Sequence, residues 1–280
     1  MKRVAVSVLK QKIEDIKEEI SFNAYANEIT AILSCDSRLI ANLIDSLINP
    51  KGRSSVAYYD HQLDKQRDYI LNFVGYMPNK LPSFKRMTIK EYFEYSSKFY
   101  KGDYLENIEK LFDLFSIDKT RRIKDISYEE KKIISFIDAV FFGPEVLILD
   151  NPFENISNIV ATKMISVINT IKANGFSVIL TSIKYDYLTI CDRIYMLDYK
   201  GIEQIKQFKN PKLFVSFEFE GDYDNIKDII ASLTKQNPII TNQSVAFVYE
   251  GDINLLLSKI NKVKIIDLKI YPCQLYQLGV

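Results

Sequence analysis

Short apolar runs, separated by segments with helical spacing, constrain the fold of this chain more than any other feature. Val146–Leu149 is such a run and ends at Asp150, and similar runs cover 176–182 and 193–197. Between the first two, residues 158–172 repeat apolar side chains with the period of an amphipathic helix. Strands that alternate with helices predict an α/β fold, with a mostly parallel sheet and helices on both of its faces.

The first helix of this pattern follows the apolar strand residues Ala31–Leu33. Residues 38–48 place their apolar side chains on one face, and Asp36 or Ser37 is positioned to cap the helix, whose end is followed by Pro50. Further helical patterns form an insertion at about 85–142, and they cover 88–93, 104–115 and 127–142.

The pattern changes after about residue 210. Strand-like and helix-like segments follow in the order β-α-β-β-α-β, which is that of a ferredoxin-like α+β unit. They cover 213–220, 223–236, 239–241, 245–249, 252–261 and 263–271. We therefore expect two domains, 1–209 and 210–280.

Composition narrows the functional classes. A net charge of +1 excludes the strong positive field of a nucleic-acid-binding protein. The single histidine, His61, excludes a multi-histidine metal site, and Cys35, Cys191 and Cys273 are spaced as free thiols of a reducing cytosol. The first residues are too short an apolar run for a secretory signal. No segment has the ~20 apolar residues of a membrane helix, so we expect membrane contact only through a partner.

Several junctions between these elements carry a family resemblance. They are 27–33, 50–52, 74–78, 87–92, 146–152 and 191–197. In order and spacing, residues 4–206 resemble the ATP-binding domain of ABC transporters. The resemblance implies a P-loop NTPase core of ABC type, with an antiparallel side sheet and a helical subdomain. The C-terminal unit resembles the small domain that follows the ATPase in the drug-, peptide- and antibiotic-export branch.

The phosphate loop of that family reads G-x-x-G-x-G-K-[ST], and its backbone N–H groups, lysine and hydroxyl hold the phosphates and Mg²⁺. The corresponding stretch here has no glycine, no lysine and no hydroxyl at the metal position, and its degenerate positions are Ser34, Ser37, Arg38, Ile40 and Ala41. We expect side chains with a Cβ in conformations usually left to glycine, and Asp36 to repel an anion at the helix start. Arg38 either replaces the lysine or is a solvated helix-start residue.

Other motif positions differ from the family as well. The expected glutamine, general base and switch histidine correspond to Asn79, Asn151 and Ile183. The signature glycines correspond to Tyr128 and Glu129, and the D-loop aspartate to Ser157. Residues 1–21 contain no Phe, Tyr or Trp, so this segment has no aromatic side chain that could stack on adenine.

Two family residues are retained, Asp150 and Ser127, and each has a structural alternative. Asp150 is either a residual metal contact or a strand-end carboxylate held by backbone N–H groups. Ser127 is either part of the signature or the N-cap of a capping box with Glu130. The charged residues at 129–132 are interpreted as a solvated face.

From these substitutions we predict no catalytic residue, no bound metal or cofactor, and a protein that is not an enzyme. The leading hypothesis is a non-catalytic ABC-like subunit on the cytoplasmic face of the membrane. It would dock on the membrane subunits of an exporter through residues 79–115 and act with an active ATPase subunit. The alternatives are a soluble regulatory or scaffold protein that keeps the fold, and an ATPase with divergent motifs.

Overall fold

The computed structural model describes residues 2–50, 54–79, 86–182 and 187–205, and also 213–272 except 235–236, 242, 250, 252 and 262. These residues fall into two compact units, the first containing β1 to β10 and the second β11 to β14. The predicted boundary near residue 209 lies in a segment outside the described residues and stays a prediction.

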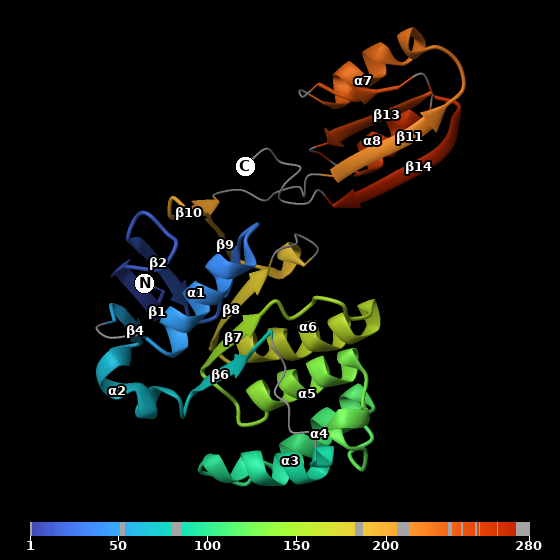
Figure 1. Ribbon diagram of the computed structural model, residues 1–280. Helices are drawn as coiled ribbons and strands as arrows, with labels where there is room; N and C mark the ends of the chain where they lie inside the picture. Colours follow the sequence, from blue (N-terminus) through green and yellow to red (C-terminus); the bar gives the residue numbers. More distant parts are fainter. Residues whose placement is uncertain are drawn as a thin grey trace. The chain divides into compact units, whose positions relative to one another are not determined.

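A six-stranded sheet forms the centre of the first unit, with the strand order β10-β9-β3-β8-β7-β6 (Figure 1). All neighbours in it are parallel except β10, which pairs antiparallel with β9. Its strands are β3 (Ile29–Leu33), β6 (Val74–Met77), β7 (Val146–Asp150), β8 (Ser177–Ser182), β9 (Arg193–Leu197) and β10 (Ile202–Ile205). Because β3, β7 and β8 are buried on both faces, they read as continuous apolar runs in the sequence.

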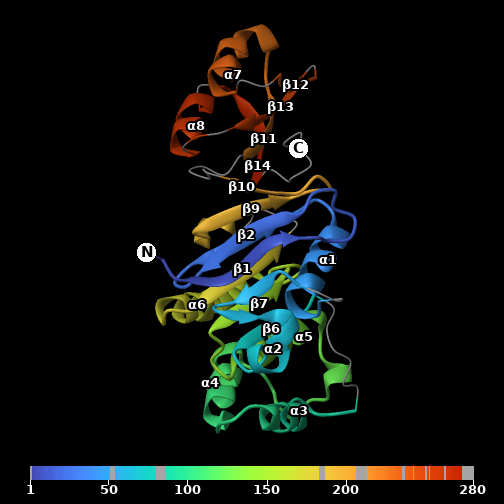
Figure 2. The ribbon, with the colours of Figure 1, turned by 90° about the vertical axis from the view of Figure 1, so that its left-hand side faces the viewer.

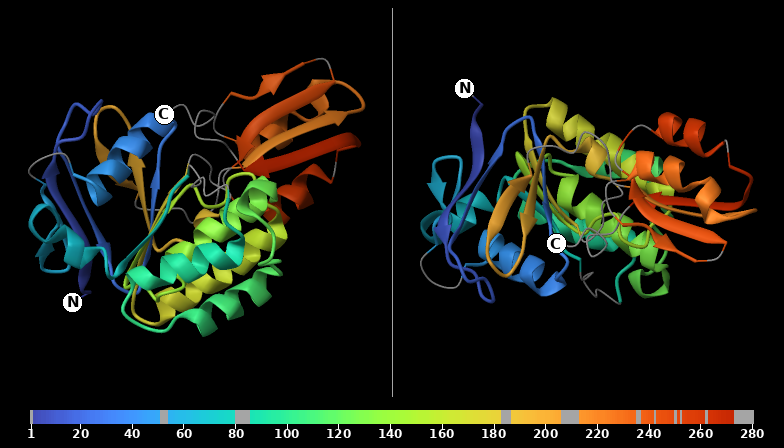
Figure 3. Two further views of the ribbon diagram at one scale, coloured as in Figure 1. Left: turned by 60° about the horizontal axis from the view of Figure 1, so that its bottom comes forward. Right: turned by 90° about the horizontal axis from the view of Figure 1, so that it is seen from above.

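A second, antiparallel sheet stands beside the first, in the order β2-β1-β4-β5. Its strands are β1 (Val4–Gln11), β2 (Ile20–Tyr25), β4 (Val56–Tyr58) and β5 (His61–Gln62), and α2 (Leu63–Ile70) follows them. Helix α1 (Ser37–Ile48) lies between the two sheets, as Figure 3 shows in its left view. Its buried face, which includes Leu43 and Leu47, shares one core with Val6 and Phe22 of the side sheet and Ile148 of β7.

The remaining helices of this unit form the helical subdomain and the cover of the parallel sheet (Figure 2). They are α3 (Ile89–Ser96), η1 (Ser97–Phe99), α4 (Leu105–Phe115), η2 (Ile123–Asp125), α5 (Tyr128–Val140) and α6 (Asn158–Ala173). The first two residues of the short η3 (Leu188–Ile190) group with the second unit. Helix α5 packs directly on β6. A Cβ added at Gly75 would lie 2.0 Å from the backbone oxygen of Ala139, so only glycine permits this close approach.

The second unit has a four-stranded antiparallel sheet in the order β12-β13-β11-β14. Its elements are β11 (Leu213–Phe219), η4 (Tyr223–Asn225), α7 (Lys227–Leu233), β12 (Ile239–Ile240), β13 (Ser244–Tyr249), α8 (Ile253–Ile260) and β14 (Ile265–Pro272). Phe217, Phe247 and Leu256 belong to a core of its own. This succession is the β-α-β-β-α-β order expected from the sequence.

The predicted fold class is therefore confirmed as α/β, with a parallel core, an antiparallel side sheet and a helical subdomain. Within the described ranges, none of the helices combines the length and the apolar character needed to span a membrane.

Candidate functional site

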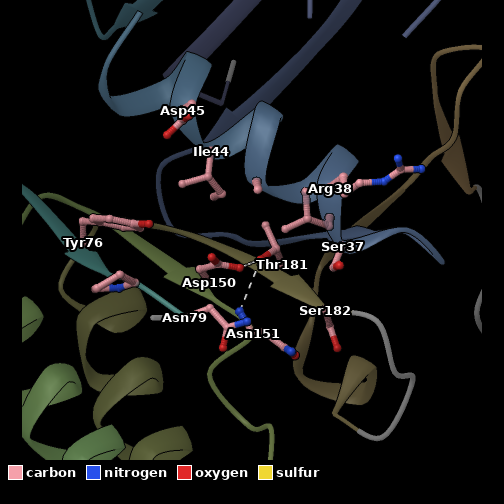
Figure 4. A pocket seen from close by; sticks show the side chains of 13 residues that line it. Ser37, Arg38, Ile44, Asp45, Tyr76, Asn79, Asp150, Asn151, Thr181 and Ser182 are labelled. Atoms are coloured by element: carbon pink, nitrogen blue, oxygen red, sulfur yellow. Dashed lines mark hydrogen bonds between the residues drawn. The ribbon is translucent and has the colours of Figure 1, made fainter. Parts of the chain in front are cut away.

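A pocket of about 400 Å³ opens at the carboxyl ends of the parallel strands, beside the start of α1 (Figure 4). This edge of an open α/β sheet is where such folds bind their ligands. The pocket is lined by Ser37, Arg38, Ile40, Ala41, Ile44, Asp45, Tyr76, Pro78, Asn79, Asp150, Asn151, Thr181 and Ser182. Most residues that the sequence marked as motif positions therefore meet in one place.

Asp36 closes the start of α1. Its carboxylate accepts a hydrogen bond from the Arg38 backbone N–H at 2.8 Å and forms an ion pair with the Arg38 guanidinium, also at 2.8 Å. These bonds hold the pKa of Asp36 below its usual value. Figure 4 shows the Arg38 side chain extending away from Asp150 and Thr181. In this arrangement Arg38 pairs with Asp36 and does not take the place of the family lysine.

The loop before α1 differs from the expectation of glycine-like conformations. None of residues 34–37 has a positive φ, and Asp36 has the extended conformation of an ordinary N-cap. Ser34 is buried, lies outside the pocket lining, and accepts a hydrogen bond from the Asp36 N–H at 3.2 Å. The expected strain is wrong because the backbone of this loop stays in regions that any residue type can adopt, while the Asp36 side chain caps the helix.

Ile40 and Ala41 stand on the first turns of α1 at the positions of the family lysine and hydroxyl. Ile40 is buried and contributes to the core between the two sheets, although it also reaches the pocket wall. Neither side chain can donate a hydrogen bond. Polar groups on this wall are therefore provided by Ser37, Arg38 and Asp45.

The opposite wall is a connected polar network at the ends of β7 and β8. Thr181 donates its hydroxyl to Asp150 at 2.9 Å, and the Asn151 N–H donates to that hydroxyl oxygen at 3.2 Å. Burial raises the pKa of Asp150, while hydrogen bonds from Thr181 and the Asn79 backbone act in the other direction. Asn151 has a φ of 50°, a left-handed conformation that asparagine tolerates better than most residues.

Behind this wall lies Lys132 of α5, whose side chain is 0% exposed. Its Nζ donates to the backbone oxygen of Asn151 at 2.8 Å and to Oδ1 of Asn79 at 3.3 Å. Burial lowers the pKa of Lys132, against the charges of Glu154 and Asp150. The interpretation of 129–132 as a solvated face is wrong for Lys132, because α5 turns it inward under the pocket.

Ser127 lies outside the pocket, at the start of α5. Its hydroxyl accepts a hydrogen bond from the Glu130 N–H at 3.1 Å, and Glu130 accepts one from the Ser127 N–H at 2.8 Å. This is the capping box that the sequence predicted. Glu129, at a signature-glycine position, accepts a hydrogen bond from the Ser157 N–H at 2.6 Å and so joins the starts of α5 and α6.

Sequence reasoning missed Asp45, Tyr76, Thr181 and Lys132. Thr181 pairs with Asp150 near the end of β8 and could have been inferred from strand order, whereas the side-chain directions of the others depend on packing. Ile183, the predicted switch position, lies outside the described residues.

The oxygen groups of the pocket fit a Mg²⁺ that arrives with phosphates. Mg²⁺ in nucleotide sites is usually held by one or two carboxylates together with substrate oxygens. Asp150 is the carboxylate placed at a strand end for such a role, and Ser37 adds a hydroxyl on the facing wall.

No family model matches the chain. An uncharacterised ABC transporter ATP-binding protein of Alkalihalophilus pseudofirmus is 24% identical over 171 residues, which are 56% of this chain and 63% of that protein. A solved ATP-binding subunit of an ABC transporter superposes with a TM-score of 0.66 at 16% identity, over 72% of this chain and 90% of its own. These matches support the ABC transporter ATP-binding domain family. The chain spans 63% and 45% of the lengths of the first two curated relatives.

The comparisons correct one expectation. The prediction that the chain is not an enzyme is wrong, because its relatives and structural neighbours are ABC ATPase domains, a class that hydrolyses ATP. The relatives do not agree on a direction of transport. One is a lipopolysaccharide export ATP-binding protein of Haemophilus influenzae, 20% identical over 66% of this chain and 82% of its own. Another is a ribose import protein of Rhizobium etli, 32% identical over 29% of this chain and 16% of its own.

Proposed function

We propose that this chain is the ATP-binding subunit of an ABC transporter of the export branch. It docks on membrane subunits at the cytoplasmic face and acts together with a second, active ATPase subunit. The observation that carries this proposal is the pocket itself. It joins Asp150, Asn79 and the start of α1 at the carboxyl edge of a parallel sheet, in the fold of ATP-binding subunits.

Nucleotide binding at this pocket meets one obstacle and has one support. The obstacle is Asp36, which already fills the start of α1, so a phosphate group must displace it from the Arg38 N–H. The support is the Asp150 network, because it presents an oriented carboxylate on the facing wall. Without a lysine at Ile40, the site lacks a charged contact worth roughly 1.5 to 3 kcal/mol. We therefore expect the isolated chain to bind nucleotide weakly.

The helical subdomain offers the docking surface for the membrane subunits. Tyr95 of α3 and Phe99 of η1 are 48% and 67% exposed, and their ring centroids lie 5.1 Å apart. Exposed aromatic side chains that lie together on a surface are typical of protein interfaces. Both residues lie within 79–115, the segment that the resemblance assigns to docking.

The test is purification of the tagged chain from native membranes under mild conditions, followed by identification of the proteins that bind to it. We expect membrane subunits and a second ATP-binding subunit in one complex that hydrolyses ATP. Recovery of the chain alone, or only with soluble proteins, would overturn the proposal in favour of a regulatory or scaffold protein.

A further inference from the structure

Lys132 is the most unusual charged group in the part of the chain that the structure describes. Its side chain is fully buried, yet both hydrogen-bond acceptors of its Nζ, the Asn151 backbone oxygen and Asn79 Oδ1, are uncharged. A buried ammonium loses its hydration, and its neutral acceptors together with the charges of Glu154 and Asp150 compensate for this only in part. Costly groups of this kind are expected at functional sites, where proteins depart from the most stable choice of residue.

The bonds of Lys132 close a ring through the pocket wall. Lys132 binds Asn79 and Asn151. The Asn151 N–H donates to the Thr181 hydroxyl oxygen, and that hydroxyl donates to Asp150. Asp150 also accepts a hydrogen bond from the Asn79 backbone. Every residue of this ring except Lys132 lines the pocket, so Lys132 connects its parts from behind the pocket wall.

We propose that Lys132 is a positioning residue, which fixes Asn79 and Asn151 at the pocket and ties their position to α5. The inference rests on the proposed function, because it assigns a role within the same nucleotide site. Helix α5 is the element that makes this coupling possible, since it begins at the capping box of Ser127 and packs against β6 at Gly75. A movement of α5 would be passed to both asparagines through the ammonium that they share.

The experiment compares Lys132→Met with Lys131→Met in the full chain. Methionine keeps most of the volume of lysine and removes the charge, and Lys131 is the neighbouring lysine, which does not line the pocket. The first readout needs no nucleotide. The side-chain amide signals of Asn79 are followed by NMR and assigned through their loss in Asn79→Ala. We expect Lys132→Met to shift these signals towards those of a solvated amide, and to unfold at the same or a higher temperature than the wild type.

The second readout is the dissociation constant for MgATP in the purified transporter complex. Loss of an outer partner that orients a site typically costs roughly 10- to 100-fold in affinity or activity. We expect a loss in this range for Lys132→Met and less than about twofold for Lys131→Met. The double variant Lys132→Met/Asn79→Ala should bind MgATP with the affinity of whichever single variant binds it less tightly. The two substitutions are not additive, because both remove the hydrogen bond between Lys132 and Asn79.

The two proposals fail in different ways. A wild-type complex that does not bind MgATP overturns the proposed function, while the Asn79 signals still decide the role of Lys132. Unchanged Asn79 signals together with a lower unfolding temperature in Lys132→Met would reduce Lys132 to a structural residue and overturn the positioning role.

Discussion

Both carboxylate oxygens of Asp36 are engaged by Arg38, one by its backbone N–H and the other by its guanidinium, each at 2.8 Å. This arrangement places a negative charge at the start of α1, where the fold would receive a phosphate. It satisfies the helix end without a ligand. The start of α1 is therefore an internally capped helix, and under the proposed function the access of nucleotide to the pocket depends on how readily Asp36 leaves.

Replacing Asp36 by glycine should strengthen nucleotide binding. Glycine at an N-cap costs only a few tenths of a kcal/mol, so the helix stays intact. Removal of an unfavourable charge at the helix start gains roughly 1 kcal/mol, or about fivefold in affinity for MgATP. Titration calorimetry on the complex measures this change. Arg38→Ala provides the opposite control, because it leaves Asp36 without its cation and should weaken binding. Equal affinities in wild type and Asp36→Gly would contradict the role given to Asp36.

The sequence predicted the buried strands β3, β7 and β8 from their continuous apolar runs, and the helix after β3 from its apolar spacing. Both signals can be recognised without knowing how the elements pack. The sequence also offered the capping box at Ser127 as one of two alternatives, because such a box depends only on residues close in the sequence. It did not predict the ordinary backbone of residues 34–37, since the absence of glycines was interpreted as strain in a loop that instead forms a different turn. The burial of Lys132 could not be predicted either, because a lysine between Lys131 and Ile133 gives no local signal of its direction.

Loss of the exposed aromatic pair should weaken docking on the membrane subunits. Truncation of an aromatic interface anchor typically costs roughly 2 kcal/mol, which is about 30-fold in affinity. Tyr95→Ser and Phe99→Ser should therefore reduce recovery of the membrane subunits with the tagged chain, with little change in its unfolding temperature. Tyr199→Ser is the matched control, because Tyr199 is as exposed but lies between β9 and β10. Equal recovery of membrane subunits with all three variants would place the docking surface elsewhere.

Ser127→Ala should lower the free energy of unfolding by about 1 kcal/mol, the typical value of an N-cap side chain. Its hydroxyl accepts from the Glu130 N–H, and that bond is lost in the variant. Thr88→Ala is a matched control, since Thr88 forms the same capping box with Glu91 at the start of α3. Urea unfolding of both variants should give similar losses. A specific drop in ATP hydrolysis by the complex in Ser127→Ala alone would show that Ser127 also contacts nucleotide.

Asp138 should make stability depend on pH in a predictable direction. It lies on α5 and accepts hydrogen bonds from the hydroxyls of Tyr92 and Ser96 at 2.8 and 2.7 Å. Burial raises its pKa, although both hydrogen bonds act in the other direction. A carboxyl group with a raised pKa holds its proton more tightly in the folded state. Its contribution to stability is therefore lost as the pH rises from the unfolded pKa through the folded one.

Asp138→Asn removes this titration while keeping an oxygen that accepts a hydrogen bond. The difference in unfolding free energy between Asp138→Asn and the wild type should therefore move in favour of the variant as the pH is raised from 4 to 7. Urea unfolding across this range measures the trend. If the difference for Asp138→Asn did not depend on pH, the two hydroxyl donors would stabilise the carboxylate as effectively as bulk water does. Burial would then not govern the protonation of Asp138.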